Sequence, residues 1–246
     1  MLHDIWTVAW KEWREYLVGQ GGGRFGRLRS LAIILIAGAF IAFSSGAQWA
    51  TSPLAFLLSS VYLPMVLTLT MVADSFAGER ERHTLETLLA SRLSDRAILF
   101  GKIAALTSYG WLLGLVGAVL SIVIANIGAL HEAPFFYTPQ TALGIVGLGV
   151  LASGLIAGAG CLVSLRAPTV RQAQQTLSLL VIAPFVIGVI GMQLVPESAQ
   201  ANLLNTLSGL DGRAALLVGV LALVTIDGTL VAIALARFRR DRLLLD

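Results

Sequence analysis

Six apolar segments, each about as long as a bilayer is thick, constrain this chain more than any other feature. They lie near residues 31–50, 54–77, 98–126, 140–165, 176–195 and 213–236. A helix needs roughly 20 mostly apolar residues to cross the hydrocarbon core. Only 13% of the residues are charged, against roughly 25% in soluble domains. The sequence therefore predicts an all-α membrane protein, with six transmembrane helices in a single domain over residues 1–246.

The basic residues sort the connectors into two sides. Lys and Arg fill the N-terminal arm, the connectors after the second and fourth segments, and the tail, whereas only Arg213 falls on the other side. Because basic residues stay on the cytoplasmic side, both termini are expected there, and the number of spans is even. The basic residues of the cytoplasmic connectors then account for the net charge of +3. We expect a multi-pass protein of the cytoplasmic (inner) membrane. Its expected partner is the lipid bilayer, and no nucleic acid is expected to bind.

A cleaved signal peptide is the alternative for the first segment, whose apolar stretch is short and is followed by small residues at 44–47. The preceding arm argues against it, because three tryptophans are unlike the short basic start of a signal peptide.

That arm predicts a helix over residues 4–18. One face carries the large apolar side chains: Trp6, Trp10, Trp13 and Leu17. The opposite face is charged, with Glu12 at its margin: Asp4, Lys11, Arg14 and Glu15. A helix with these two faces is typical of the plane of the membrane interface. Anchoring alone and transmission of movement from a cytoplasmic partner to the first span are both compatible with this pattern.

The connector over residues 78–97 concentrates charge between two apolar segments. It opens with acids and bases in alternation: Glu79, Arg80, Glu81 and Arg82. A leucine ridge at the spacing of an amphipathic helix follows Thr84: Leu85, Leu88 and Leu89. Ser94 is placed to cap the helix of the third span. The ridge needs cover from the membrane, from the underside of the bundle or from a partner protein, and the mixed charges favour a partner.

Residues 74–102 resemble the same stretch of ABC exporter permeases of the second type. The marks that carry the resemblance are Glu79–Arg80–Glu81, Thr84–Leu85–Glu86–Thr87–Leu88–Leu89 and Gly101–Lys102. His83 stands where a glycine is common, and residues 91–94 replace a stretch that often contains proline. The amphipathic arm, the six spans and the cytoplasmic termini extend the resemblance over the whole chain.

The resemblance implies a type V ABC exporter fold, with an interfacial helix and a cytoplasmic coupling helix. It implies a permease that pairs with a second copy or a related permease and moves its substrate outward. A separate ATP-binding subunit would bind ATP and Mg and drive the transport. The coupling helix would dock on that subunit through Glu79, Arg80, Glu81, Arg82, Thr84, Leu85, Glu86, Leu88 and Leu89. The resemblance does not indicate the substrate.

The residues themselves give no sign of an enzyme. Gly101–Lys102 does not belong to a G-x-x-x-x-G-K-[ST] phosphate loop. Arg96 stands at the position of the first glycine, and Ile103 stands at the Ser/Thr position. The three histidines lie near or outside the span boundaries, and the one cysteine, Cys161, lies inside an apolar run. We therefore expect no bound cofactor, no metal site and no catalytic dyad in this chain.

Asp227 lies deep in the sixth segment, where a charge costs about 2.5–3.5 kcal/mol to insert. It either lines a transport pathway or is a polar group packed within the bundle. The first possibility supports an alternative function, an ion- or proton-coupled secondary transporter, although proton relays commonly use several facing acids. A third hypothesis is a membrane anchor whose connector recruits a cytosolic protein. An ABC exporter permease is the leading interpretation.

Overall fold

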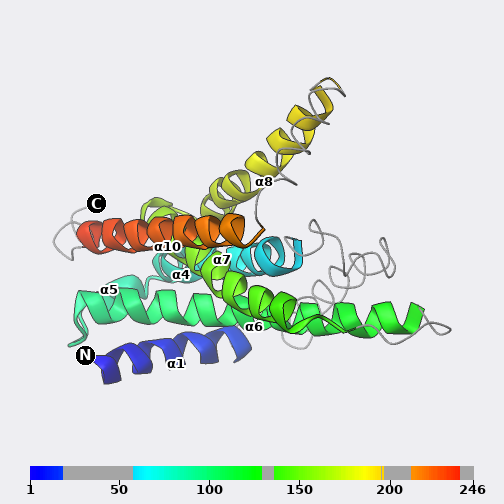
Figure 1. Cartoon of the computed structure of the whole chain (residues 1–246). Helices are drawn as coiled ribbons and strands as arrows, with labels where there is room; N and C mark the ends of the chain where they lie inside the picture. The colour runs from blue at the N-terminus through cyan, green and yellow to red at the C-terminus, as the bar shows by residue number, and fades with distance from the viewer. Residues whose placement is uncertain (19–57, 129–135, 195, 197–211, 239–246) are drawn as a thin grey trace.

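A computed structural model of the protein describes residues 1–18, 58–128, 136–194, 196 and 212–238, and every element in this part of the chain is helical (Figure 1). In chain order the elements are α1 (Leu2–Val18), the π-helical turn η2 (Leu58–Tyr62), α4 (Leu63–Glu81), α5 (Leu85–Leu89), α6 (Asp95–Gly128), α7 (Pro139–Arg166), α8 (Val170–Leu194) and α10 (Gly212–Arg237). The predicted all-α fold class is confirmed for these residues.

Four stretches of these helices are long and apolar enough to cross a membrane: Ser60–Glu81, Asp95–Val123, Pro139–Arg166 and Leu217–Arg237. They overlap the second, third, fourth and sixth predicted spans. The fifth predicted span, 176–195, overlaps α8, and the first, 31–50, lies outside the described residues. A multi-pass helical membrane protein is therefore supported, whereas the count of six spans and the type V fold stay predictions.

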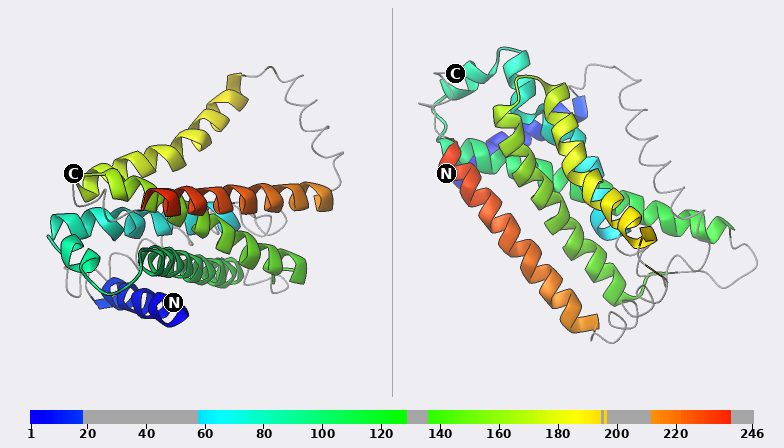
Figure 2. Two further views of the ribbon diagram at one scale, coloured as in Figure 1. Left: turned by 90° about the vertical axis from the view of Figure 1, so that its left-hand side faces the viewer. Right: turned by 90° about the horizontal axis from the view of Figure 1, so that it is seen from above.

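α7 lies at the centre of the bundle and contacts α4, α6, α8 and α10 (Figures 1 and 2). Glycines permit this close packing, because a Cβ at Gly160 would collide with Val72 of α4 and one at Gly110 with Thr68. A Cβ at Gly158 would already touch Leu230 of α10, at 3.4 Å from its Cβ. Small residues of this kind let membrane helices approach each other closely.

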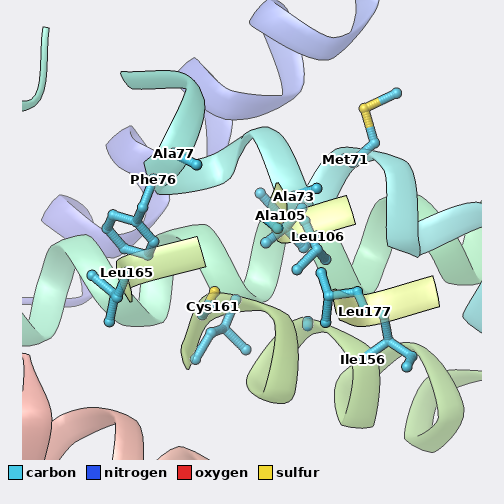
Figure 3. Close-up of a cluster of buried hydrophobic side chains, with 14 of the residues drawn as sticks. Met71, Ala73, Phe76, Ala77, Ala105, Leu106, Ile156, Cys161, Leu165 and Leu177 are labelled. Carbon is cyan, nitrogen blue, oxygen red and sulfur yellow. The ribbon is translucent and has the colours of Figure 1, made fainter. Parts of the chain in front are cut away.

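The apolar core lies where α4, α6, α7 and α8 meet (Figure 3). Phe76, Leu106, Ile156 and Leu177, one from each helix, are fully buried there. Cys161 is buried among them, so it is a packing residue, as the sequence indicates. α8 leaves the bundle at its C-terminal end, which projects outward in Figure 1.

α1 packs along the beginning of α6 and runs in the same direction (Figure 1). A Cβ at Gly101 would lie 2.6 Å from that of Val8, so only glycine allows this approach. Further along, Trp13 Nε1 donates a hydrogen bond of 2.8 Å to Ser108 Oγ. The ring centroids of Tyr16 and Tyr109 lie 5.5 Å apart.

α1 packs on α6 through a different face from the tryptophan face, which is predicted to lie at the membrane interface. Trp6 and Trp10 are 67% and 61% exposed and stack on each other, and Trp13 is only partly buried. The buried face consists of Val8, Ala9, Glu12 and Tyr16, because the small residues fit over Gly101 and Glu12 meets a charge described below. The side chain of Leu17 lies outside the described residues. The predicted place of α1 at the bilayer interface stays a prediction.

The turn between α4 and α5 contains the one positive φ among the described non-glycine residues, 55° at His83. This is the position where the resembling permeases commonly have glycine, so the left-handed backbone explains the preference. The predicted short helix is confirmed as α5, and Ser94 Oγ accepts a bond of 3.2 Å from the amide of Ala97, as its capping role requires.

Replacing His83 by glycine is expected to stabilise the protein by about 1 kcal/mol, because a residue with a Cβ is strained in the left-handed region. The measurement is thermal unfolding in detergent. His83→Ala is the matched control: it removes the imidazole but keeps the Cβ, so it is expected to gain nothing. Equal stability of the two variants would contradict strain at this residue.

Candidate functional site at the connector end of the bundle

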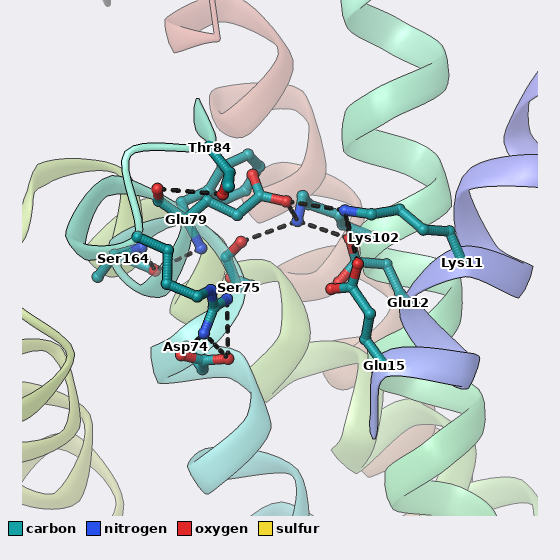
Figure 4. Close-up of polar contacts among 12 residues, drawn as sticks. Lys11, Glu12, Glu15, Asp74, Ser75, Glu79, Thr84, Lys102 and Ser164 are labelled. Atoms are coloured by element: carbon teal, nitrogen blue, oxygen red, sulfur yellow. Dashed lines mark hydrogen bonds and ion pairs between the residues drawn. The ribbon is translucent and has the colours of Figure 1, made fainter. Parts of the chain in front are cut away.

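A buried lysine joins three helices at the end of the bundle that carries α5. Lys102, in the second turn of α6, is 0% exposed, and its Nζ donates three hydrogen bonds (Figure 4). The acceptors are Glu12 Oε1 of α1 at 2.8 Å, Glu79 Oε1 of α4 at 3.0 Å and the Ser75 carbonyl at 2.8 Å. An ammonium group has three donors, so this one is fully satisfied. Both carboxylates, 2% and 3% exposed, are buried with it.

Lys11 extends this charge cluster to the surface. Its Nζ lies 3.1 Å from Glu79 Oε1 and 3.2 Å from Glu15 Oε1. Tyr16 donates a bond of 3.1 Å to the second oxygen of Glu12. Burial acts to raise the pKa of Glu12, but the charges of Lys102 and Lys11 outweigh burial and hold this pKa below its usual value. Glu12 is therefore ionised at neutral pH, and α1 is held to α4 and α6 by charge.

The first three residues of the acid–base run at the end of α4 each bond to another helix. Glu79 binds Lys102 of α6. Arg80 donates bonds of 2.8 and 2.5 Å to the carbonyls of Leu165 and Ala167 at the end of α7. Glu81 accepts a bond of 2.8 Å from the amide of Val170, the first residue of α8.

These partners suit the helix ends. The last carbonyls of a helix accept no hydrogen bond within that helix, so they attract cations. The first amides donate none, so they attract anions. Arg80 and Glu81 thus satisfy groups that α7 and α8 leave unpaired.

Ser164 completes the connection between α7 and α4 (Figure 4). Its Oγ accepts bonds from the amides of Phe76 and Ala77, at 3.0 and 2.9 Å, and donates to the carbonyl of Ala73 at 3.1 Å.

We call residues 79–82 the stem of α5, because this well-fixed segment carries the short helix.

The stem residues predicted to meet a partner are thus engaged inside the protein. Arg82 pairs with Asp74 at 3.1 Å, across Gly78. Leu85 is buried and Leu88 packs against the core, so the underside of the bundle covers the leucine ridge, where the pattern favoured a partner. The Thr84 hydroxyl bonds to the Glu79 carbonyl at 3.3 Å, and the side chain of Leu89 lies outside the described residues.

The outer face of α5 stays open to a partner. It consists of exposed residues: Glu86, Thr87 and Ala90. Of the predicted coupling residues, only Glu86 has an exposed side chain with no hydrogen bond or ion pair to another described residue. The docking role of this face is untested and stays a prediction.

Sequence reasoning missed Glu12 and Lys102 as site residues. In the sequence Lys102 stands out only as part of the Gly101–Lys102 motif, and Glu12 lies at the margin of a charged face. The available signal was the Gly101–Lys102 pair, because a lysine several residues inside an apolar segment requires an acidic partner.

Asp227 of α10 lies against α7. One carboxylate oxygen, Oδ2, is 3.2 Å from where a Cβ of Gly154 would stand. The other, Oδ1, is buried and has no hydrogen-bond partner among the described residues. This position is compatible with both predicted roles, pathway and packing, and neither is tested.

Two comparisons with known proteins agree with the motif. Residues 53–209, more than half of the chain, match a family described as "ABC-2 family transporter protein". The ABC transporter permease protein NatB of Bacillus subtilis (strain 168) is 27% identical over 139 residues, which cover 52% of this chain and 36% of NatB. The chain thus aligns with little more than a third of that relative.

Lys102→Met is expected to destabilise the protein by about 3–5 kcal/mol, because it leaves two buried carboxylates without a countercharge. Adding Glu12→Gln and Glu79→Gln to Lys102→Met is expected to recover most of this loss. Chemical unfolding of the purified variants in detergent measures both values. A Lys102→Met variant as stable as the wild type would show that the cluster does not hold α1.

Acidification is expected to weaken the docking of α1. Because the pKa of folded Glu12 is lowered, its stabilisation is complete above its usual pKa and is lost as the pH falls through the folded pKa. Between about pH 5 and pH 3, Glu12→Gln is expected to lose less thermal stability than the wild type. Glu15→Gln, an exposed neighbour, is the control and is expected to follow the wild type. Parallel curves for all three would contradict the lowered pKa.

Proposed function

Because the chain belongs to the ABC-2 family of transporter proteins, we propose that it is the membrane subunit of an ATP-driven exporter. A separate ATP-binding subunit binds ATP and Mg²⁺ and hydrolyses the nucleotide. This chain, not itself an enzyme, pairs with a second copy or a related permease in the cytoplasmic membrane, with both termini in the cytoplasm. Substrate moves outward along a path bounded by the spans.

The observation that carries the proposal is the fixation of the stem of α5. Glu79, Arg80 and Glu81 bond to α6, α7 and α8, and Lys11 and Lys102 connect Glu79 to α1. A coupling element must pass force to the spans without bending. A five-residue helix fixed at its stem to this many helices meets that requirement, and its outer face remains free for the motor subunit.

The force has a direct route to the centre of the bundle. Arg80 is hydrogen-bonded to the end of α7, the helix that contacts α4, α6, α8 and α10. Rotation or translation of the stem therefore moves α7 and the helices packed on it together. The alternative function, an ion- or proton-coupled secondary transporter, rests on Asp227, whose Oδ1 is buried without a hydrogen-bond partner among the described residues.

Reconstitution with and without a separate ATP-binding subunit tests this function. In proteoliposomes, we expect candidate amphiphilic and ionic tracers to move only when the ATP-binding subunit and ATP are both present. Tracer movement driven by a proton gradient in the absence of that subunit would instead establish the secondary transporter.

Glu86→Arg is expected to reduce the coupling of ATP turnover to transport by about tenfold, because the charge reversal lies on the open face of α5 and leaves the stem bonds intact. Thermal unfolding is expected to be unchanged. Gln140→Arg, which adds the same side chain to an exposed position at the start of α7, is the control. Normal coupling in Glu86→Arg would remove the outer face of α5 from the mechanism.

A further inference from the structure

We propose that Asp227 of α10 recognises the positively charged group of the exported substrate, and that this substrate is an amphiphilic amine, a protonated nitrogen joined to an apolar body. The inference rests on the proposed function and deepens it, because it names the class of substrate. Four features of Asp227 support it: its depth in the bundle, its lack of a countercharge, its apolar surroundings and its access from the membrane.

Asp227 lies near the middle of its span. Measured from the connector end of each helix, Asp227 of α10 and Gly154 of α7 lie roughly 15–18 Å into the bundle, at about 1.5 Å per residue. This is about half of the roughly 30 Å hydrocarbon core. Figure 2 shows α7 and α10 running side by side. At this depth the bilayer offers no water to a polar group.

Asp227 has no countercharge among the described residues. The buried acids Glu12 and Glu79 share the ammonium group of Lys102, whereas no ion pair in this part of the chain includes Asp227. Its Oδ1 is buried and has no hydrogen-bond partner there. Because an unpaired carboxylate is costly at this depth, a cation from outside the chain gains affinity by pairing with it.

The groups around the carboxylate are apolar or lack a side chain. A Cβ at Gly154 would lie 3.2 Å from Asp227 Oδ2 and 4.0 Å from the methyl carbon of Thr107 in α6. One turn further along α7, a Cβ at Gly158 would lie 3.4 Å from the Cβ of Leu230. The glycines thus leave room beside the carboxylate, and the walls of that room are apolar.

These surroundings favour an amine over a metal ion. The described residues include no group of three or more His, Cys, Asp or Glu side chains that could hold a metal ion. A metal ion exchanges its water for several oxygens, whereas a single carboxylate can pair with a protonated amine. One charged group within apolar walls is the usual pattern of a site for a small organic molecule.

The carboxylate can be reached from the membrane. Asp227 is only half-buried, and its neighbours Ile226 and Gly228 are exposed on the outer surface of α10. A Cβ at Gly228 would meet no atom of the described residues within 4 Å. The apolar body of an amphiphilic amine partitions among the lipid tails, so such a molecule reaches Asp227 from the side of α10.

α7 connects this site to the stem of α5. Arg80 and Ser164 join the connector end of α7 to α4, and Gly154 of the same helix lies beside Asp227. A movement of α7 relative to α10 therefore changes the space next to the carboxylate. The motor subunit can strengthen or weaken the binding of the amine in this way.

The test is equilibrium binding to the purified full-length permease in nanodiscs of phosphatidylcholine, with empty nanodiscs as background. The probes are a dansyl-linked alkylamine and the dansyl-linked alcohol of the same length, which share the apolar body and differ in charge. We expect the wild type to bind the amine at least about tenfold more tightly, since the amine adds a charge-assisted hydrogen bond. Asp227→Asn is expected to abolish this preference and to leave the affinity for the alcohol unchanged.

Two further variants accompany Asp227→Asn. Asp4→Asn is the matched control, because it removes a half-exposed carboxylate of α1 outside the site, and it is expected to bind both probes like the wild type. Gly154→Ala keeps the carboxylate and places a methyl group 3.2 Å from Oδ2, so it is expected to weaken binding of the amine more than that of the alcohol. Thermal unfolding confirms that each variant folds.

The outcomes separate the inference from the function. If folded Asp227→Asn keeps the preference for the amine, Asp227 is not the recognition residue and the inference is overturned. If one of lithium, sodium and potassium displaces the amine selectively at equal ionic strength, the site holds a metal ion and the substrate class is wrong. ATP-driven export without binding of the amine excludes the inference and leaves the proposed function intact. Binding of the amine that depends on Asp227, without ATP-dependent transport, supports the recognition site and removes the proposed function.

Discussion

A buried ammonium group between two carboxylates fixes the connector end of this protein. Lys102 could not remain charged without Glu12 and Glu79, and each carboxylate would be equally costly without Lys102. The three groups come from three helices, so the position of each helix depends on the other two. The short helix α5 follows Glu79 by six residues and takes its position from this arrangement.

Polar bonds have this influence because apolar packing alone discriminates poorly inside a membrane. Lipid tails are as apolar as leucine, so the association of spans depends on close contact and on hydrogen bonds. In this protein the close contacts and the hydrogen bonds occur in different places. Glycines bring α4, α6 and α7 together along their length, and charged side chains connect the helix ends near α5. The glycine contacts set the distances between the helices, and the charged side chains hold the helix ends in register.

The sequence predicts the elements well and their contacts less well. Apolar length locates the second, third, fourth and sixth predicted spans, the leucine spacing locates α5, and Ser94 caps α6 as expected, because these signals are local. The packed face of α1 depends on Gly101 and Lys102, about 90 positions away, so the tryptophan periodicity alone does not identify it. The charges of Glu79, Arg80 and Glu81 look like a solvent-exposed surface, yet their partners are backbone groups and two lysines that no local pattern identifies.

The burial of Cys161 has a practical consequence. It is the one cysteine of the chain and has no exposed surface. Thiol-specific dyes and spin labels therefore do not reach it in the folded protein. A single cysteine introduced on the outer face of α5 becomes a unique attachment point in an otherwise native chain, and spectroscopy can follow that helix without first removing a core side chain.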